Sequence, residues 1–245
     1  MSNKIFNATL MKKIAYLTVL AMFAASSAVA DDKPKKSAKP DFDNVQGMAL
    51  VIKTVKTVEA REKQEAWKSV KRGDQLNSGT QVKTGAESFS ILKFVDGSVI
   101  RVQENTEIVV KGDKDAKSGK MDKSIDLNLG RIGFNVKKRP DEQFRFTSPT
   151  SVASIKGTAG VRGVDFLLIL EGSAELSLPN GTGTQAVGAG QIAEIINGQV
   201  VVRQATQDEI NAAKRAIAET GTGKVIIDFR DKQGNLKSIE VTPGQ

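Results

Sequence analysis

The 245-residue chain contains no cysteine and no histidine, and only one tryptophan and one tyrosine. Without cysteine it has no disulfide, no thiolate nucleophile and no cysteine-based zinc site. Without histidine it lacks the commonest general base and metal ligand, which excludes Ser-His-Asp and Cys-His catalysis. The scarcity of large aromatic rings argues against a stacking platform for single-stranded nucleic acid. We therefore expect no enzyme activity, no catalytic, cofactor or metal residues, and no nucleic-acid partner.

Residues 1–30 have the pattern of a secretory signal peptide. Met11-Lys12-Lys13 precedes an apolar run from Ile14 to Val29, and Ala28-Val29-Ala30 has the small residues of a cleavage site. The run is short for a membrane span and contains serine, so we expect cleavage after Ala30 and no stable span afterwards. The alternative is an uncleaved anchor, and either Met1 or Met11 could be the start. The pattern predicts a periplasmic or secreted protein.

The net charge of +8 falls to +5 without the first 30 residues, which hold three lysines and no acidic residue. The remaining basic residues are mixed with acidic ones along the chain, which favours a solvated surface over one basic patch. Contact with an anionic envelope polymer is the alternative. Residues 31–42 are polar and contain proline, which is typical of a flexible linker.

Residues 43–203 predict a mainly β domain made of short strands and turns. Around residue 90, Ser88, Ser90 and Leu92 fall on one strand face, while Phe89, Ile91, Lys93 and Val95 fall on the other. Asp96-Gly97, Asn180-Gly181 and Asn197-Gly198 are turn signals, because glycine accepts the positive φ of a tight hairpin. Polar composition predicts loops at residues 59–66 and 111–123.

The β architecture is left open between a roll, a sandwich and a solenoid-like fold. Gly73, Gly79 and Gly85 recur every six residues, which fits solenoid rungs but equally fits evenly spaced turns. These glycines, with Asp74, Asp96 and Gly97, are interpreted as turn residues and not as a functional site.

Residues 204–245 predict a small helix followed by a β-hairpin. Thr206 and Glu209 have the spacing of a capping box, in which each side chain bonds the other's backbone N–H. Ile210, Ala213 and Ile217 give the helix, expected over residues 206–220, a narrow apolar face. Gly221 is the expected C-terminal cap. Residues 225–229 and 238–241 are the expected hairpin strands.

Three short patterns contain residue types of chemical sites but lack the spacing or the structural context that those sites need. Gly157, Gly160 and Gly163 lack both the Lys-Ser/Thr of a phosphate loop and a following helix, so they are expected to allow close strand contacts. Asp113, Asp115 and Asp122 do not have the spacing of an EF-hand calcium loop. Ser90 and Lys93 have catalytic spacing on a helix, but an offset of three on a strand points them to opposite faces.

The central stretch resembles the FecR domain family, whose pattern is a tryptophan followed by G-D-x-L, V-x-T-G and a strand ending in D-G-S. The matching residues are Trp67, Gly73-Asp74, Leu76, Gly79, Val82, Thr84-Gly85, Ser88, Leu92, Phe94 and Asp96-Gly97-Ser98. Later segments also resemble it, at residues 127–132, 144–149, 172–176 and 189–191. The resemblance extends over residues 45–202.

The sequence departs from the family in one element. The usual V-R-G-T-x-F element has two incomplete candidates, Ile155-Lys156-Gly157-Thr158 and the segment from Val161 to Phe166. Family members that regulate sigma factors carry a helical cytoplasmic segment before one membrane span. This chain instead has a signal-peptide pattern, so it resembles the standalone exported members.

The resemblance implies a non-catalytic exported protein that binds another envelope protein in signalling or assembly. The alternative is an accessory protein that binds envelope glycan or takes part in polysaccharide export, with an anionic glycan as ligand. Sugar sites favour exposed aromatic side chains, however, and Trp67 is expected to pack in the domain or at its rim.

Overall fold

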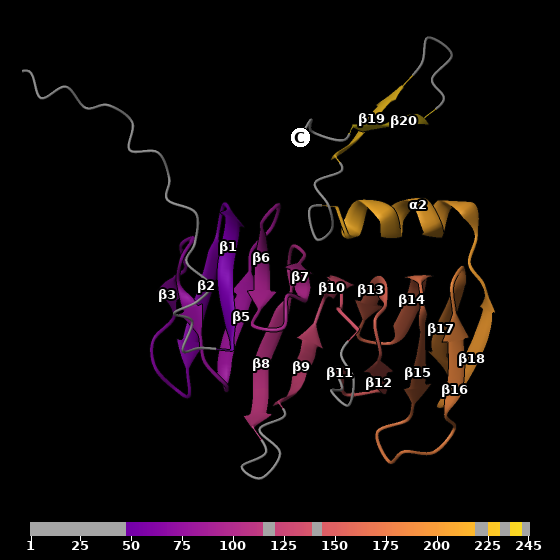
Figure 1. Cartoon of the computed structure of the whole chain (residues 1–245), viewed down its shortest axis with the longest axis horizontal. Helices are drawn as coiled ribbons and strands as arrows, with labels where there is room; N and C mark the ends of the chain where they lie inside the picture. The colour runs from indigo at the N-terminus through magenta and orange to yellow at the C-terminus, as the bar shows by residue number, and fades with distance from the viewer. Residues whose placement is uncertain (1–47, 115–120, 139–143, 219–224, 231–235, 242–245) are drawn as a thin grey trace, which may run out of the picture. The chain divides into compact units, whose positions relative to one another are not determined.

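The computed structural model describes residues 48–114, 121–138, 144–218, 225–230 and 236–241. These residues form two nine-stranded sheets, one helix and a two-stranded hairpin (Figure 1). The predicted signal peptide and linker lie outside the described ranges, so these two segments and the division at residues 43 and 203 remain predictions.

The first sheet has the strand order β18-β17-β14-β13-β10-β7-β6-β1-β4. In that order its strands are Gln199–Gln204, Gln191–Ile196, Phe166–Glu171, Ala159–Gly163, Arg131–Asn135, Val99–Val102, Phe89–Phe94, Ala49–Val55 and Gln75–Leu76.

The second sheet has the order β16-β15-β12-β11-β9-β8-β5-β2-β3. Its strands are Gln185–Gly188, Ser173–Ser177, Val152–Ile155, Phe144–Thr147, Met121–Leu129, Glu107–Lys114, Thr80–Thr84, Val58–Glu62 and Lys68–Ser69. The helix α2 spans Gln207–Ala216, and β19 (Val225–Arg230) pairs with β20 (Leu236–Val241).

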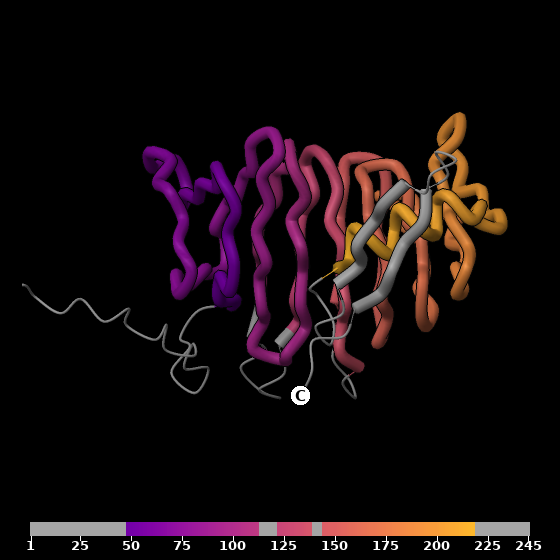
Figure 2. The backbone as a smooth tube through the Cα atoms, turned by 90° about the horizontal axis from the view of Figure 1, so that it is seen from above, coloured from indigo at the N-terminus to yellow at the C-terminus, as the bar shows by residue number. Residues whose placement is uncertain are grey.

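The chain moves along both sheets in the same direction, and it alternates between them every one or two strands. Figures 1 and 2 show the strand colours passing in order from indigo to orange. The pairings are antiparallel except that of β11 with β9, which is parallel. The predicted mainly β fold with a C-terminal helix is confirmed, and the open choice among architectures resolves to two packed sheets with a solenoid-like progression.

The two sheets bury one face of each against the other. Phe94 of β6 packs edge-on against Phe144 of β11, with ring centroids 5.0 Å apart. Phe134 of β10 packs against Phe146 of β11 at 4.8 Å. All four rings belong to one continuous hydrophobic core to which both sheets contribute. Their burial is the main stabilising term, since each aromatic ring removes a large apolar area from water.

Two stretches predicted as polar loops are in part strands. The strand β2 includes residues 59–62 of the expected 59–66 loop, and these residues pair with β5. Likewise β8 continues to Lys114 and β9 begins at Met121, so residues 111–114 and 121–123 of the expected 111–123 loop are paired strand residues. Cross-strand hydrogen bonding thus outweighs polar composition in both stretches.

The Asp96-Gly97 turn does more than reverse the chain. Gly97 has the positive φ of +85° expected of it. The Asp96 carboxylate accepts hydrogen bonds from the Ser98 backbone N–H (2.8 Å) and hydroxyl (3.0 Å). It also lies 3.3 Å from the Lys123 ammonium of β9, and the two side chains are only 5% and 2% exposed. A buried ion pair therefore joins the β6–β7 turn of the first sheet to the second sheet.

Arg162 belongs to Val161-Arg162-Gly163, the second candidate for the family's V-R-G element. It is fully buried on β13, where its guanidinium donates to the hydroxyls of Ser148 (2.8 Å) and Ser151 (2.7 Å) and to the Phe166 carbonyl (2.9 Å). Burial lowers the pKa of Arg162 to about 10, which still leaves it charged at neutral pH. This arginine holds the β11–β12 turn against the first sheet, which is a structural role.

We predict that Lys123→Met destabilises the protein by about 3–5 kcal/mol, because it removes the buried cation that lies 3.3 Å from the Asp96 carboxylate. Urea unfolding followed by Trp67 fluorescence measures the change. The matched control is Lys68→Met, which breaks an exposed pair with Glu65 (2.9 Å) and should therefore change stability much less. Equal losses of stability in Lys123→Met and Lys68→Met would show that the buried ion pair stabilises the protein no more than the exposed pair does.

Candidate functional site

Helix α2 lies against the outer face of the first sheet, where it contacts β10, β13 and β14 (Figure 1). The predicted capping box is confirmed. The Glu209 N–H donates to the Thr206 hydroxyl (3.3 Å), and the Thr206 N–H donates to the Glu209 carboxylate (2.8 Å). The helix is shorter than expected, since Ile217 is its C-terminal cap. Gly221, the predicted cap, lies outside the described residues.

A small second core lies between the helix and the sheet. Its buried members are Val161, Leu168, Ile192 and Ala213. Partly buried side chains surround them, namely Phe166, Leu170, Ala205, Ala216 and Ile217. Ala213 is the one buried residue of α2 itself. The helix thus covers an apolar patch of the sheet with a small contact, separate from the main core.

Gly133 of β10 lets the end of the helix approach the sheet. A Cβ atom at this position would lie 2.2 Å from the Ala216 carbonyl oxygen, which is backbone and cannot swing aside. The sheet has no side chain there, so the last turn of α2 rests directly on the strand backbone.

Two side chains of the sheet bind the carbonyls at the C-terminal end of α2. Gln103 donates from Nε2 to the Ala216 carbonyl at 2.7 Å. Arg101 donates to the Ala218 carbonyl at 3.0 Å, and its guanidinium lies 3.8 Å from the centre of the Phe89 ring. Carbonyls at a helix end have no partner within the helix, and a cation there also complements the helix dipole. The sheet therefore supplies the cap for this helix.

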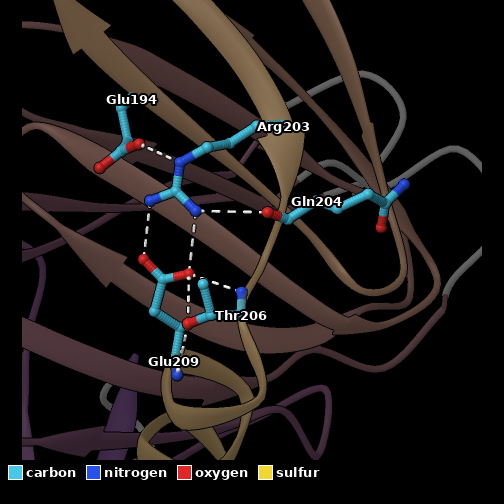
Figure 3. A network of polar contacts seen from close by, with 5 residues as sticks. All are labelled: Glu194, Arg203, Gln204, Thr206 and Glu209. Carbon is cyan, nitrogen blue, oxygen red and sulfur yellow. Dashed lines mark hydrogen bonds and ion pairs between the residues drawn. The ribbon is translucent and has the colours of Figure 1, made fainter.

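At the other end of α2, Arg203 of β18 joins the sheet to the first helical turn (Figure 3). Its guanidinium binds both carboxylate oxygens of Glu209, at 2.7 and 2.9 Å, and donates from Nε to Glu194 of β17 at 2.9 Å. The hydrogen bond from Arg203, then that from the Thr206 backbone, lowers the pKa of Glu209 to about 2. Glu209 and then Glu194 raise the pKa of Arg203 above its ordinary value.

A groove of about 560 Å³ runs between α2 and the sheet. Its floor includes Val161, Phe166, Leu168 and Ile192, and α2 contributes Ala212, Ala213 and Ala216. Charged side chains line the rest, namely Arg101, Arg131, Glu194, Glu209 and Arg215. An apolar floor with polar groups around it is suited to binding a side chain or a short segment of a partner.

The residues of the Ser-x-x-Lys and glycine patterns lie in strands and turns. The Ser90 hydroxyl is buried and donates to the Lys53 carbonyl (3.1 Å), while Lys93 lies on the opposite face of β6. Gly157 is a turn residue with φ of +68°, and Gly160 and Gly163 lie in β13.

Two of the three aspartates that do not fit a calcium loop lie on paired strands. Asp113 of β8 and Asp122 of β9 are partners in the strand register, and Asp115 is outside the described residues. Within the described ranges, no three acidic side chains come close enough to hold a metal ion.

Trp67 is half-buried at the edge of the second sheet. The Arg61 guanidinium lies 4.4 Å from the Trp67 ring centre, and the Lys83 ammonium lies 4.3 Å from it. These cation–π contacts occupy at least one face of the ring, which a stacked sugar would need. The expected packing at the rim of the domain fits this arrangement.

The sequence offered little sign of the groove. The capping box is local, but Arg203, Glu194 and Gly133 come from three separate strands, and Gln103 directly follows β7. In the sequence, only the amphipathic pattern of the helix indicates such a site, because its apolar face must pack on an apolar surface. The part of the chain that the structure describes contains no helix long and apolar enough to cross a membrane.

Residues 80–182 match the family model described as "FecR protein", and this segment runs from β5 to just beyond β15. It lies within residues 45–202, the stretch that resembles the FecR domain family. Strands β17 and β18 and helix α2 come after it, so the groove combines residues of the matched segment with residues that follow it.

Two crystal structures of a proposed anti-sigma factor from Parabacteroides distasonis are similar to the chain, one at 2.50 Å and one at 1.65 Å resolution. Each is 12% identical to it with a TM-score of 0.45. The matches cover 54% and 63% of this chain, and 62% and 70% of the crystallised chain. No curated protein sequence matches.

We predict that the Glu209 carboxylate, followed by NMR, titrates near pH 2 in the intact protein. Because the folded pKa is lower than the ordinary 4.5, this contact stabilises helix docking above about pH 4.5 and is lost as the pH falls toward 2. In Arg203→Gln the titration should move up toward the ordinary value. Lys214→Gln, an exposed change on the same helix, should leave it unmoved; an unshifted titration in Arg203→Gln would contradict the assignment.

We predict that Gly133→Ala displaces the last turn of α2 and costs about 1–3 kcal/mol, as overpacking of a close contact does. Hydrogen exchange should show weaker protection at the helix C-terminus than in the unmodified chain. Gly188→Ala is the control, because its new methyl would meet only the flexible Gln191 side chain at 3.3 Å. Unchanged protection in Gly133→Ala would mean that the helix does not rest on β10.

Proposed function

We propose that this chain, through its FecR domain, is a non-catalytic exported module that binds another protein in cell-envelope signalling or assembly. The family match supports the link with signalling. The signal-peptide pattern of residues 1–30 supports export, and the lack of cysteine and histidine supports a role without catalysis. The observation that carries the proposal is the groove in which α2 joins the FecR domain.

The groove has the features of a protein-binding surface and few of a catalytic one. Its floor is apolar, whereas its two carboxylates, Glu194 and Glu209, are already bound by Arg203. A group held as the anion by a guanidinium is a poor proton acceptor at neutral pH. An apolar centre with a charged rim is the usual composition of a protein–protein contact.

The docking of α2 also suits a surface that changes on binding. The helix is held by polar contacts at its two ends and by one buried alanine between them. Small contacts of this kind open more readily than a main core does. A partner segment could therefore enter beside the helix without disturbing the two packed sheets.

The alternative is an accessory protein that binds anionic envelope glycan. The net positive charge of the chain favours it, but the cations over Trp67 occupy the ring that a sugar would stack on. We therefore place this alternative second.

The experiment is photocrosslinking in living cells with a crosslinking amino acid at Ala212, an exposed helix residue that lines the groove. We expect one dominant protein adduct and a mature N-terminus at Asp31 by mass spectrometry. The matched control is the same amino acid at Leu129, which is 60% exposed on the second sheet and should capture far less.

Other results would overturn parts of the proposal. Capture of glycan in place of protein at Ala212 would favour the accessory role. An intact N-terminus would mean that residues 1–30 act as an anchor. Equal capture at Ala212 and Leu129 would mean that the groove is not the binding surface.

A further inference from the structure

The two ends of the paired sheets differ in the strands that form their edges. At the end nearest the N-terminus, the outermost strands β4 and β3 have two residues each. Very short edge strands resist pairing with another chain. At the opposite end the first sheet finishes with β18, which has six residues, Gln199–Gln204. Figure 1 shows β18 as the last strand of its sheet.

The outward backbone groups of β18 can be assigned from its hairpin with β17. Asn197 and Gly198 both have positive φ, as a two-residue hairpin turn requires, so Ile196 and Gln199 form its hydrogen-bonded closing pair. The bond from the Ala205 N–H to the Gly190 carbonyl (2.9 Å) continues the same alternation. The N–H and C=O groups of Val200 and Val202 therefore point away from β17. They have no hydrogen-bond partner among the described residues.

The side chains of β18 leave this edge open to a partner. Val200 and Val202 are partly buried and pack against the main core. Val201 is 40% exposed on the outer face, diagonal to Ile196 of β17, which is 46% exposed. The edge has no lysine, proline or bulge of the kind that blocks strand addition. Its one charge, Arg203, is already bound by Glu194 and Glu209.

We propose that β18 pairs antiparallel with β18 of a second copy of this chain, about a two-fold axis at Val201. An isologous contact requires a surface that is complementary to itself, and the segment from Gln199 to Arg203 has three central valines and a single charge. In this register Val200 of each copy exchanges both backbone hydrogen bonds with Val202 of the other copy. Val201 then faces Val201 of the second copy, and Gln199 faces Arg203, so no like charges meet.

Pairing in this register also covers apolar surface. The exposed side chains of Val201 and Ile196 from both copies come together on the outer face of one continuous sheet. The partly buried Val200 and Val202 gain a neighbour at the open end of the core. Repeat-like β structures need such covering at their ends, because an uncapped end leaves backbone groups and apolar side chains exposed.

The test uses the full chain, purified as the cell leaves it, with a single cysteine introduced by Val201→Cys. The chain has no other cysteine, so no disulfide can form within one copy. Residues that face each other without mutual hydrogen bonds have Cα atoms about 4.5 Å apart, which lies within disulfide range. We expect the unmodified chain to sediment as a dimer, and Val201→Cys to crosslink under mild oxidation. Leu129→Cys, at a position that is more exposed than Val201 (60% against 40%) but away from the edge, should not crosslink.

A charge exchange tests the same register without a new covalent bond. Val201→Lys and Val201→Glu should each lower the dimer fraction at least tenfold, because like charges then face each other at the axis. An equal mixture of the two variants should restore dimers. Trp67 fluorescence shows that both remain folded.

A monomeric unmodified chain, or a dimer that Val201→Lys leaves intact, would overturn the proposal. Strand addition by a different protein at β18, seen as its capture by Val201→Cys in place of a second copy, would overturn it as well. The result is independent of the groove. Capture at Ala212 tests the proposed function, and the dimer fraction tests this edge.

Discussion

The structure depends on the burial of one face of each sheet against the other. The four phenylalanines Phe94, Phe134, Phe144 and Phe146 meet at the centre of this contact and link β6, β10 and β11. Once these faces are buried, each sheet has one face left over. On the first sheet that outer face is apolar at Val161, Leu168 and Ile192, and α2 covers it. The position of the groove is therefore a consequence of how the main core is filled.

Charged groups inside the domain are tolerated because each one has specific partners. Lys123 reaches Asp96 from the other sheet, and Arg162 binds Ser148 and Ser151. A buried charge without a partner would cost several kcal/mol, so these contacts restrict how the sheets and turns can pack. They add selectivity for one arrangement more than they add net stability. The turn residues around Asp96 are in this way part of the core.

The contacts at the two ends of α2 are polar and near the surface, whereas the main core is apolar and buried. Arg203 with Glu209 and Glu194, and Gln103 with the Ala216 carbonyl, are polar and near the surface, so each contributes little by itself. Such contacts fix the direction of the helix on the sheet. The protein-binding role and the pairing of β18 with a second copy are two separate proposals, because α2 lies on the outer face of the first sheet and β18 lies at its edge.

What the sequence determined was local. The Asn197-Gly198 hairpin, the positive φ of Gly97 and the Thr206–Glu209 capping box follow from residues a few positions apart. Tertiary structure decided the rest, because it depends on partners distant in sequence. Only strand pairing turns the polar residues 111–114 into β8, and only the packed sheets bring Lys123 to Asp96. Likewise, the order of the strands decides whether Arg203 remains a surface charge or binds Glu209 of the helix.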